Sequence, residues 1–391
     1  MKRFVQLHLL TAYPPANLNR DDLGRPKTAL VGGAERLRIS SQSLKRAWRT
    51  SCMFETFKEA GMGKRTKRIG EEYIYPELSK VLPNDDAIQW TRDILEAYGE
   101  LDKAGKDDPD RRRDIYLKQL VFIAPIEEEL LKEFVACLAR GLQGNVGKEI
   151  SEIIELRNAR DKAKGKDKKQ KHSRLIELLK ETLLVQTPKA VDIALFGRML
   201  ASSPKFNIEA ACQVAHAITV HRVAVEDDYY TAVDDLNRGE EDAGAAHIGE
   251  TEFGAGVFYL YICLDRQLLL DNLGGDVALA ERAIEALVKS AATVAPTGKQ
   301  NSFGSRARAS YILCEKGNAQ PRGLSVAFLK PIEPGRDGLL ANAINALEQE
   351  RERLDKAYGD GDPDAVIMNT PAGKGTLRDV IDYAKKGLSD G

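Results

Sequence analysis

The chain has 391 residues, and its 58 Lys and Arg against 59 Asp and Glu leave a formal net charge of -1. A near-neutral chain has no global affinity for nucleic acid, so any such site must be a local segregation of charge. The five cysteines are widely spaced, odd in number and never in a C-x-x-C pair. This pattern favours free thiols in a reducing compartment over a disulfide framework or a zinc site. No apolar run reaches membrane-spanning length, so we expect a cytoplasmic protein without membrane contact.

The first elements are predicted to be a strand and a helix. Residues 5–9 alternate between apolar and polar side chains, which is typical of a strand with one buried face. A Gly- and Arg-rich loop follows Pro14 and Pro15. Ser40 then precedes apolar residues at helical spacing, so we predict a helix that begins there with serine as its N-cap.

Residues 53–186 differ in character from what precedes them. Charge is dense there, β-branched runs are few, and residues 127–142 and 175–184 have helical spacing. We therefore predict a helical insertion. Its basic run, residues 157–174, is broken by Asp161, Gly165 and Asp167.

The remaining chain alternates between predicted strands and helices. Strands are expected over residues 212–220 and 257–264, and the residues between them far exceed an ordinary hairpin loop of two to five. Residues 221–255 are therefore predicted to form a protruding arm. Further elements are expected as a helix at 277–291, strands at 309–314 and 324–329, and helices at 339–358 and 377–386. This order favours an α+β fold, an RRM- or ferredoxin-like sheet split by insertions.

The strongest functional signal is the segment from Leu18 to Arg49. It holds eight basic residues against three acids: Arg20, Arg25, Lys27, Arg36, Arg38, Lys45, Arg46 and Arg49, against Asp21, Asp22 and Glu35. Lys45 and Arg49 share one face of the predicted helix. The free N–H groups at its start suit phosphate oxygens, and Gly32-Gly33 lets a backbone come close. A phosphate site and a solvated basic helix both fit these residues.

The same segment closely resembles the start of the CasC family, the crRNA-binding backbone subunit of the type I-E CRISPR Cascade complex. The matching motifs are LNRDD, VGGAERLRISSQSLKRA, VDIALFGRM, AHAITVHRV running to YYTAVDDL, and more loosely AHIGETEFGAGVFY and residues 296–303. The resemblance implies an RRM-like palm over residues 1–52 and 187–391, helical fingers over 53–186, and a β-hairpin thumb near 221–255. It also implies a subunit without cofactor or enzymatic activity.

The resemblance implies a set of RNA-binding residues. In the palm, the guide phosphates would be held by Arg20, Lys27, Ser40, Gln42, Lys45, Arg46 and Arg49, joined by Lys299 and Gln300. Met199 would lie against a base. Tyr229, Tyr230 and Thr231 would belong to a thumb that crosses the guide of a neighbouring subunit and displaces a base. Packing of both tyrosines against the next subunit is the alternative.

The implied partners are crRNA, other copies of this chain, other Cascade subunits (large, small, guide-end-capping and crRNA-processing) and target DNA. Holding only phosphate, ribose and shape would let such a subunit serve any guide and leave base edges free to pair. The basic run of the insertion has two readings. It is a flexible solvated linker, or Lys168, Lys169, Lys171 and Arg174 attract the backbone of target DNA.

Asp21 and Asp22 carry the one catalytic alternative. Related backbone subunits of type III complexes use an aspartate in a comparable palm loop to cut RNA with a metal. The other reading is that these acids pair with neighbouring arginines or contact the adjacent subunit. A protein scaffold without RNA contact is a third function, but it leaves the concentration of charge at Leu18 to Arg49 unexplained.

Overall fold

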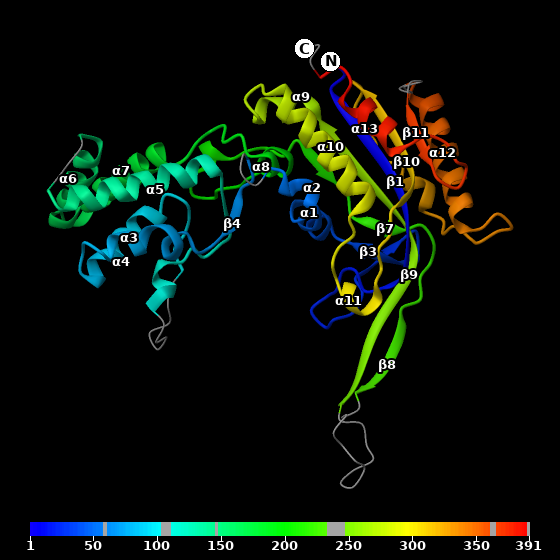
Figure 1. The fold of residues 1–391 in the computed structure, drawn as a ribbon, viewed down its shortest axis with the longest axis horizontal. Helices are drawn as coiled ribbons and strands as arrows, with labels where there is room; N and C mark the ends of the chain where they lie inside the picture. The colour runs from blue at the N-terminus through cyan, green and yellow to red at the C-terminus, as the bar shows by residue number, and fades with distance from the viewer. Residues whose placement is uncertain (58–60, 103–110, 145–147, 233–246, 360–364, 389–391) are drawn as a thin grey trace, which may run out of the picture. The chain divides into compact units, whose positions relative to one another are not determined.

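The computed structural model describes residues 1–57, 61–102, 111–144, 148–232, 247–359 and 365–388 (Figure 1). The chain divides into two compact units. Unit 1 comprises Met1–Thr56, Cys212–Gln267 and Val277–Gly391, and unit 2 comprises Phe57–Ala211 and Leu268–Asp276. The sequence placed the corresponding junctions at residues 52 and 187. The fold is mixed α+β with an antiparallel main sheet, as the sequence predicted.

Unit 1 is built on a nine-stranded sheet. Its main path runs β11-β10-β1-β9-β7-β3-β2, and β6 and β8 also pair with β9. The strands are β1 (Phe4–Ala16), β2 (Thr28–Val31), β3 (Ala34–Ile39), β6 (Cys212–Val214), β7 (Ala217–Thr219), β8 (Glu226–Ala232), β9 (His247–Asp265), β10 (Ala309–Gly317) and β11 (Val366–Asn369). The helices are α1 (Ser41–Arg49), α2 (Cys52–Glu55), α10 (Val277–Thr293), α11 (Gln300–Phe303), η4 (Ser325–Phe328), α12 (Leu339–Tyr358) and α13 (Leu377–Lys385), and α9 (Arg266–Asn272) begins at the end of β9.

Strand β1 is buried on both faces, so the expectation of one buried face is wrong. It lies between β9 and β10, and residues from Val5 to Thr11 are all buried. Helix α12 and η4 cover the face that carries Leu10. The even-numbered polar residues are therefore enclosed: His8 is fully buried and bonds the Tyr259 hydroxyl at 2.9 Å and Glu315 at 3.2 Å. Burial lowers the pKa of His8 although Glu315 opposes the shift.

The segment expected to be a Gly- and Arg-rich loop is partly a hairpin, β2–β3. Strands of four and six residues are too short to show a clear period in the sequence. Its turn is Gly32-Gly33, with φ of 59° and 73°. Positive φ at both central residues is the requirement of a type I′ turn. A Cβ on Gly32 would lie 1.7 Å from the Leu329 carbonyl oxygen, so the backbone that approaches this glycine is the chain's own.

Substitution of Gly32 is expected to destabilise unit 1 more than substitution of Gly33. Both alanines would take a positive φ at about 1–2 kcal/mol, but only at position 32 would the new methyl overlap another backbone, adding about 1–3 kcal/mol. Nothing lies within 4 Å of a Cβ on Gly33, which makes Gly33→Ala the matched control. Chemical denaturation compares the two variants. Equal unfolding free energies would show that the contact with Leu329 contributes nothing.

Other elements of unit 1 refine the sequence predictions. The strand expected over 212–220 is two short strands, β6 and β7, separated by Ala215 and His216. The strand expected at 324–329 is instead the 3-10 helix η4, which places Phe328 in the core under α12. Helix α12 begins and ends at the predicted residues. Strand β11 was not predicted.

The predicted arm is a β-hairpin formed by β8 and the first part of β9. The strands pair antiparallel from Glu226↔Phe253 to Ala232↔His247, and they extend beyond the rest of the sheet (Figure 1). We call these paired residues the thumb hairpin. Residues 233–246 of the predicted arm lie outside the described residues. Strand β9 continues from the hairpin into the centre of the sheet, beside β1.

Unit 2 is mainly helical. It contains α3 (Tyr75–Leu78), α4 (Asn84–Leu95), α5 (Pro125–Leu142), α6 (Lys148–Lys162), α7 (Gly165–Leu183), α8 (Val191–Phe196), the π-helix η1 (Gly70–Ile74), the 3-10 helices η2 (Arg111–Ile115) and η3 (Pro204–Phe206), and the strand pair β4 (Lys64–Thr66) and β5 (Val121–Ile123). One core joins α4, α5, α6 and α7 through residues such as Trp90, Leu131 and Leu179. None of the helices in the described part of the chain is long and apolar enough to cross a membrane.

Candidate nucleic-acid interface

Helix α1 presents three faces. Leu44, Ala47 and Trp48 are buried. Ser40 is the N-cap, as predicted, and its hydroxyl accepts from the Ser43 N–H at 3.3 Å. Two polar faces flank the buried one. Ser43, Arg46 and Thr50 follow one another along the first, and Gln42, Lys45 and Arg49 along the second.

The segment before β2 folds into a compact loop, residues 17–27. The Asp21 carboxylate accepts from the N–H groups of Leu23 and Arg25, both at 2.9 Å. Asn19 Oδ1 accepts from the Ser40 N–H at 2.8 Å and so ties the loop to the start of α1. The LNRDD motif is therefore a structural one in part, since two of its side chains hold the loop.

A second loop, residues 296–304, packs against the first. A Cβ on Gly298 would lie 2.5 Å from the Leu18 carbonyl oxygen, so only glycine permits this approach. Lys299 takes a left-handed φ of 45°, and its ammonium donates to Thr251 Oγ1 at 2.6 Å. The Phe303 ring lies 5.8 Å from that of Phe253. The loop is thus fastened to the base of the thumb hairpin.

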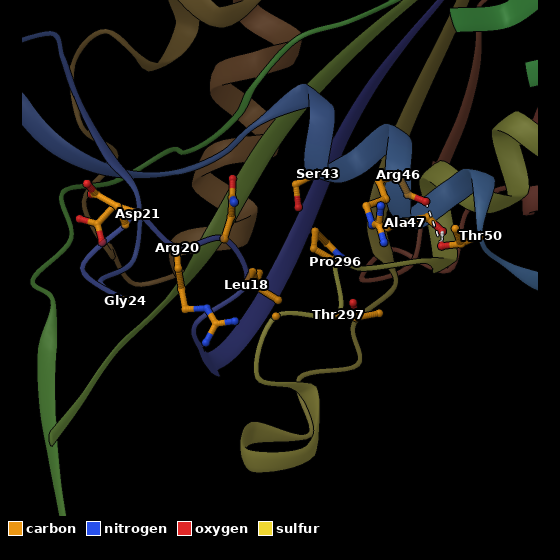
Figure 2. A pocket seen from close by; sticks show the side chains of 13 residues that line it. Leu18, Arg20, Asp21, Gly24, Ser43, Arg46, Ala47, Thr50, Pro296 and Thr297 are labelled. Atoms are coloured by element: carbon orange, nitrogen blue, oxygen red, sulfur yellow. Dashed lines mark hydrogen bonds between the residues drawn. The ribbon is translucent and has the colours of Figure 1, made fainter. Parts of the chain in front are cut away.

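These segments enclose a hollow of about 450 Å³, which we call the palm hollow (Figure 2). Helix α1, loop 17–27 and loop 296–304 each contribute to it. The lining residues are Leu18, Asn19, Arg20, Asp21, Asp22, Gly24, Ser43, Arg46, Ala47, Thr50, Pro296, Thr297 and Gly298. Figure 2 shows Arg46 on α1 above Pro296 and Thr297, with Arg20 on the adjacent loop.

The structure brings together only some of the predicted palm residues. Arg20 and Arg46 line the hollow, whereas Lys45 and Arg49, predicted as a phosphate clamp, lie on the neighbouring face of α1. Gln42 is exposed, and Lys27, the last residue of loop 17–27, is half-buried. Ser40 acts as the helix cap, with 8% of its surface exposed. Gln300 opens α11, and its side-chain Nε2 is buried without a hydrogen-bond partner among the described residues.

The segment from Leu18 to Arg49 exposes fewer unpaired basic side chains than its sequence suggested. Arg36 is fully buried and donates to the carbonyl oxygens of Thr219 and Phe328, both at 3.0 Å. Arg25 pairs with Glu252 at 3.1 Å. Arg38 bonds His216 at 2.8 Å, and burial together with Arg38 and Lys27 lowers the pKa of His216, which keeps it neutral at pH 7.

Arg20 and Arg46 differ from those side chains. Within the described ranges, neither guanidinium has an ion pair. The hollow also contains Asp21 and Asp22, so its own formal charges cancel. The Asp21 carboxylate accepts from backbone N–H groups instead of from the predicted arginines, so it does not pair with either guanidinium group.

The thumb hairpin carries the predicted tyrosines on β8. Tyr229 lies opposite Glu250 and Tyr230 opposite Gly249. A Cβ on Gly249 would lie 2.5 Å from the Tyr230 ring, so this ring occupies the space beside the Gly249 backbone. Tyr229 is 59% exposed and Tyr230 44%. Thr231 is exposed beside them, and the neighbouring side chains of β8 include the acids Asp227 and Asp228. An acidic surface repels phosphate and suits contact with a basic surface.

Met199 lies in unit 2, at the end of the VDIALFGRM motif, and is 76% exposed. The preceding Arg198 is buried, and its guanidinium pairs with the buried Glu127 at 2.6 Å. Arg198 also donates to the carbonyl oxygens of Phe206 and Val185. The motif therefore builds a fixed turn that presents the methionine outward.

The basic run of unit 2 is ordered in α6 and α7, so the prediction of a flexible linker is wrong. Arg160, in the run, is buried and bonds Asp93 at 2.6 Å. Lys168 and Lys169 are exposed on the first turn of α7. Lys171 pairs with Asp167 at 2.7 Å and Arg174 with Glu177 at 3.6 Å. Of the four cations predicted to meet DNA, the lysines at 168 and 169 are exposed and have no ion pair among the described residues.

The sequence pattern of the CT1975-like protein family (Cas_CT1975) matches residues 5–386, nearly the whole chain. The chain belongs to this family. No curated protein matches it significantly. Among solved structures, a chain of a "CRISPR RNA-guided surveillance complex, pre-nicking" is similar, with a TM-score of 0.76 and 27% identity over 98% of this chain and 100% of that one. A chain of a "CRISPR RNA-guided surveillance complex" shares the fold, with a TM-score of 0.54 and 24% identity over 98% of each chain.

The palm hollow of this CT1975-like protein includes residues that the sequence reasoning missed. Ser43, Thr50 and Thr297 add hydroxyl groups, and Asn19 positions the loop. The spacing of Ser43, Arg46 and Thr50 marks one helical face and was visible in the sequence. The sequence did not reveal that this face, instead of the face with Lys45, lies opposite loop 296–304. That arrangement depends on contacts between residues more than 240 positions apart in the chain. Among the described residues of this CT1975-like chain, no group of three or more His, Cys, Asp or Glu is placed to hold a metal ion.

Proposed function

We propose that this chain is the crRNA-binding backbone subunit of a type I-E Cascade surveillance complex. Several copies bind side by side along one guide, hold it through phosphates and present its bases to target DNA. The full-length similarity to a chain of an RNA-guided surveillance complex supports this role. The remaining partners are the large, small, guide-end-capping and crRNA-processing subunits. The protein acts without a cofactor.

The observation that carries the proposal is the palm hollow. Two arginines from separate segments line one hollow beside hydroxyl groups, and no described acid pairs with either. Guanidinium and hydroxyl donors bind phosphate oxygens and set the position of a strand without reading its bases. A subunit that serves any guide requires this kind of contact. Lys27, Gln42, Lys45, Arg49, Lys299 and Gln300 extend the phosphate track beyond the hollow, and in unit 2 Met199 contacts a base.

Copurification tests this function. The chain is expressed with a guide transcript, purified, and scored for bound RNA by absorbance and size exclusion, beside an Arg20→Glu/Arg46→Glu variant of the palm hollow. We expect large, salt-sensitive assemblies containing RNA for the wild type and smaller, RNA-poor species for the variant. If both elute alike without RNA although the transcript is present, the chain does not bind a guide in this way, and a protein scaffold becomes the better account.

We propose further that the chain is not a nuclease. The alternative, metal-dependent cutting of paired RNA through Asp21 or Asp22, is disfavoured for Asp21 because its carboxylate accepts two backbone N–H groups. Asp22 is exposed and lines the hollow, so it is the one to test. Incubation of the assembled protein with target RNA and Mg²⁺ or Mn²⁺ should leave the RNA intact. Cleavage that disappears in Asp22→Ala would overturn the assignment.

For the thumb hairpin, we propose that its exposed tyrosines contact a neighbouring subunit. Replacing both, as Tyr229→Ala/Tyr230→Ala, is expected to weaken assembly on a long guide about 10-fold, since exposed aromatic anchors dominate such interfaces. Binding of one subunit to a short RNA should be unchanged. Light scattering and filter binding measure the two quantities. Tyr358→Ala, which removes a tyrosine 74% exposed on α12, is the control. Equal loss on the short RNA would favour the base-displacing role instead.

For the basic run, we propose that Lys168 and Lys169 approach the backbone of target DNA. Lys168→Glu/Lys169→Glu should weaken binding of duplex DNA by the guide-loaded assembly. The slope of log affinity against log salt should fall by about 2, because each phosphate contact contributes about 0.9. Lys80→Glu/Lys118→Glu changes the charge of unit 2 equally at two other exposed lysines. An unchanged slope in the first variant would remove the DNA role.

A further inference from the structure

Three basic side chains of unit 1 meet where β3 pairs with β7. Arg38 lies opposite Ile218 in the register of the two strands, and His216 directly precedes β7. Arg38 Nη1 lies 2.8 Å from His216 Nδ1, and Arg38 Nε donates to the Thr28 carbonyl oxygen at 3.4 Å. Lys27, directly before β2, is close enough for its charge to act on His216. We call Lys27, Arg38 and His216 the β3–β7 cluster.

The β3–β7 cluster has no acidic partner in the described part of the chain. Neither Lys27 nor Arg38 has an ion pair there, and the charges that act on His216 are those of these two cations. Two other arginines of the same segment differ, since Arg25 is paired with an acid and Arg36 is buried against carbonyl oxygens. His216 is exposed and both cations are half-buried, so a ligand can reach them from solvent. Cations held together without a counter-charge attract an anion.

The hydrogen bond between Arg38 and His216 determines which nitrogen of the imidazole carries the proton. A guanidinium can only donate, so His216 Nδ1 accepts and has no proton. The proton of the neutral ring is therefore on Nε2, which can donate to a ligand. Burial, followed by the charges of Arg38 and Lys27, lowers the pKa of His216, so the ring is neutral at pH 7.

Other titratable groups around His216 keep their charge near neutral pH. On the β9 side, the Ala215 N–H donates to the Tyr261 carbonyl oxygen at 2.9 Å, and burial raises the pKa of the Tyr261 hydroxyl far above its usual value. In β6, burial raises the pKa of the Cys212 thiol to about 12, although the charge of Lys45 on α1 opposes the shift. Among these described groups, His216 is the one whose charge can change in this pH range.

We propose that the β3–β7 cluster binds a phosphodiester of the guide RNA and that His216 takes up a proton from solvent as the phosphate binds. This proposal rests on the proposed function, and it assigns Arg38 and His216, to which that function gives no role. A protonated ring cannot accept from Arg38, so their hydrogen bond is replaced. A phosphate between the two groups accepts from both, and Lys27 adds a third donor.

The sign of the pH dependence follows from the charge of the phosphate. Its negative charge offsets the repulsion that Arg38 and Lys27 exert on a protonated His216, so the pKa of His216 is higher in the complex than in the free protein. Binding therefore strengthens as the pH falls through the pKa of the complex, and the gain is complete below the lower pKa of the free protein. A phosphodiester keeps its single charge throughout this range.

Fluorescence anisotropy with a labelled oligouridine guide tests the proposal. Affinity for the full chain is measured from about pH 8 to about pH 6 at constant ionic strength. Uracil does not titrate in this range, so the RNA itself adds no pH dependence. The variant is His216→Gln, which cannot take up the proton. The control is His172→Gln, which removes an imidazole of unit 2 that bonds Glu96 at 2.8 Å.

We expect the wild type and His172→Gln to bind about 10-fold more tightly at the lower pH, because a charge-assisted hydrogen bond is added. His216→Gln should match the wild type at the higher pH and show no gain. Isothermal titration in two buffers of different ionisation enthalpy should show net proton uptake by the wild type and none by His216→Gln. The wild-type measurement needs no substitution, so it tests the proposal even if a variant folds poorly.

The outcomes distinguish this proposal from the guide-binding function. If RNA binds but His216→Gln keeps the pH dependence of the wild type, the β3–β7 cluster takes up no proton and the proposal is wrong, while guide binding stands. Absence of proton uptake by the wild type has the same meaning. If RNA binds at no pH, both the proposal and the guide-binding function are overturned.

Discussion

Charge reversal of the two palm-hollow arginines, as Arg20→Glu/Arg46→Glu, is expected to weaken binding of a guide RNA by at least about 100-fold. Each arginine is proposed to make a charge-assisted hydrogen bond to phosphate, worth about 1.5–3 kcal/mol. Reversal adds repulsion to that loss. The salt slope should fall by about 1.4, since each phosphate contact on a single strand contributes about 0.7. Fluorescence anisotropy with a labelled guide over a range of salt concentrations gives both quantities.

The control must separate the loss of direct contact with RNA from the effect of a change in net charge. Arg353→Glu/Arg378→Glu changes the net charge of unit 1 by the same amount at side chains that are 73% and 69% exposed. We expect its affinity to stay within about threefold of the wild type, because distant surface charges are screened by salt. Equal loss in both variants would mean that total charge, and not the palm hollow, determines binding. The variant Lys45→Glu/Arg49→Glu then measures how much the neighbouring face of α1 contributes to the affinity for guide RNA.

The largest effect on stability is expected at the buried pair of Arg198 and Glu127. Arg198→Met should lower the unfolding free energy of unit 2 by about 3–5 kcal/mol, since it leaves a buried carboxylate without its partner. Glu127 also accepts from the N–H groups of Ala124 and Val185, at 3.0 and 2.9 Å, and so joins α5 to the segment after α7. Loss of the pair therefore loosens the turn that presents Met199.

An exposed pair of equal length supplies the control. Lys80 and Glu77 are also 2.6 Å apart, but their side chains are 63% and 47% exposed. Lys80→Met should change stability by about 1 kcal/mol or less. Chemical denaturation in a Trp48→Phe background uses Trp90, then the sole tryptophan, as a reporter inside unit 2. Similar losses of unfolding free energy for Arg198→Met and Lys80→Met would show that burial does not strengthen the pair of Arg198 and Glu127.

Local signals explain which parts of unit 1 were predictable. Ser40 before an apolar helical period specified α1, because both its cap and its buried face lie within nine residues. Helix α12 was likewise predicted over its full length. Strand β1 was recognised, but its two-sided burial was not, because the enclosure of His8 depends on α12 more than 300 residues away. The β2–β3 hairpin was missed since its strands are short and its turn glycines resemble a loop.

The sequence identified the region of the candidate site, but it did not show which basic side chains of that region line the palm hollow. The density of basic residues from Leu18 to Arg49 marked the region, yet Arg36 is buried in the core and Arg25 is paired. Which basic face of α1 meets a hollow is decided by loop 296–304, which no local pattern of α1 reveals.

The most direct test of the central claim is the mass of the assembly on guides of increasing length. The chain is mixed with RNAs of two unrelated sequences, each in a series of lengths, and analysed by size exclusion with light scattering. If the chain forms a guide-bound backbone, the mass will rise in equal steps as the RNA lengthens, at the same lengths for both sequences. A single bound copy at every length, or steps that depend on the sequence, would contradict the account.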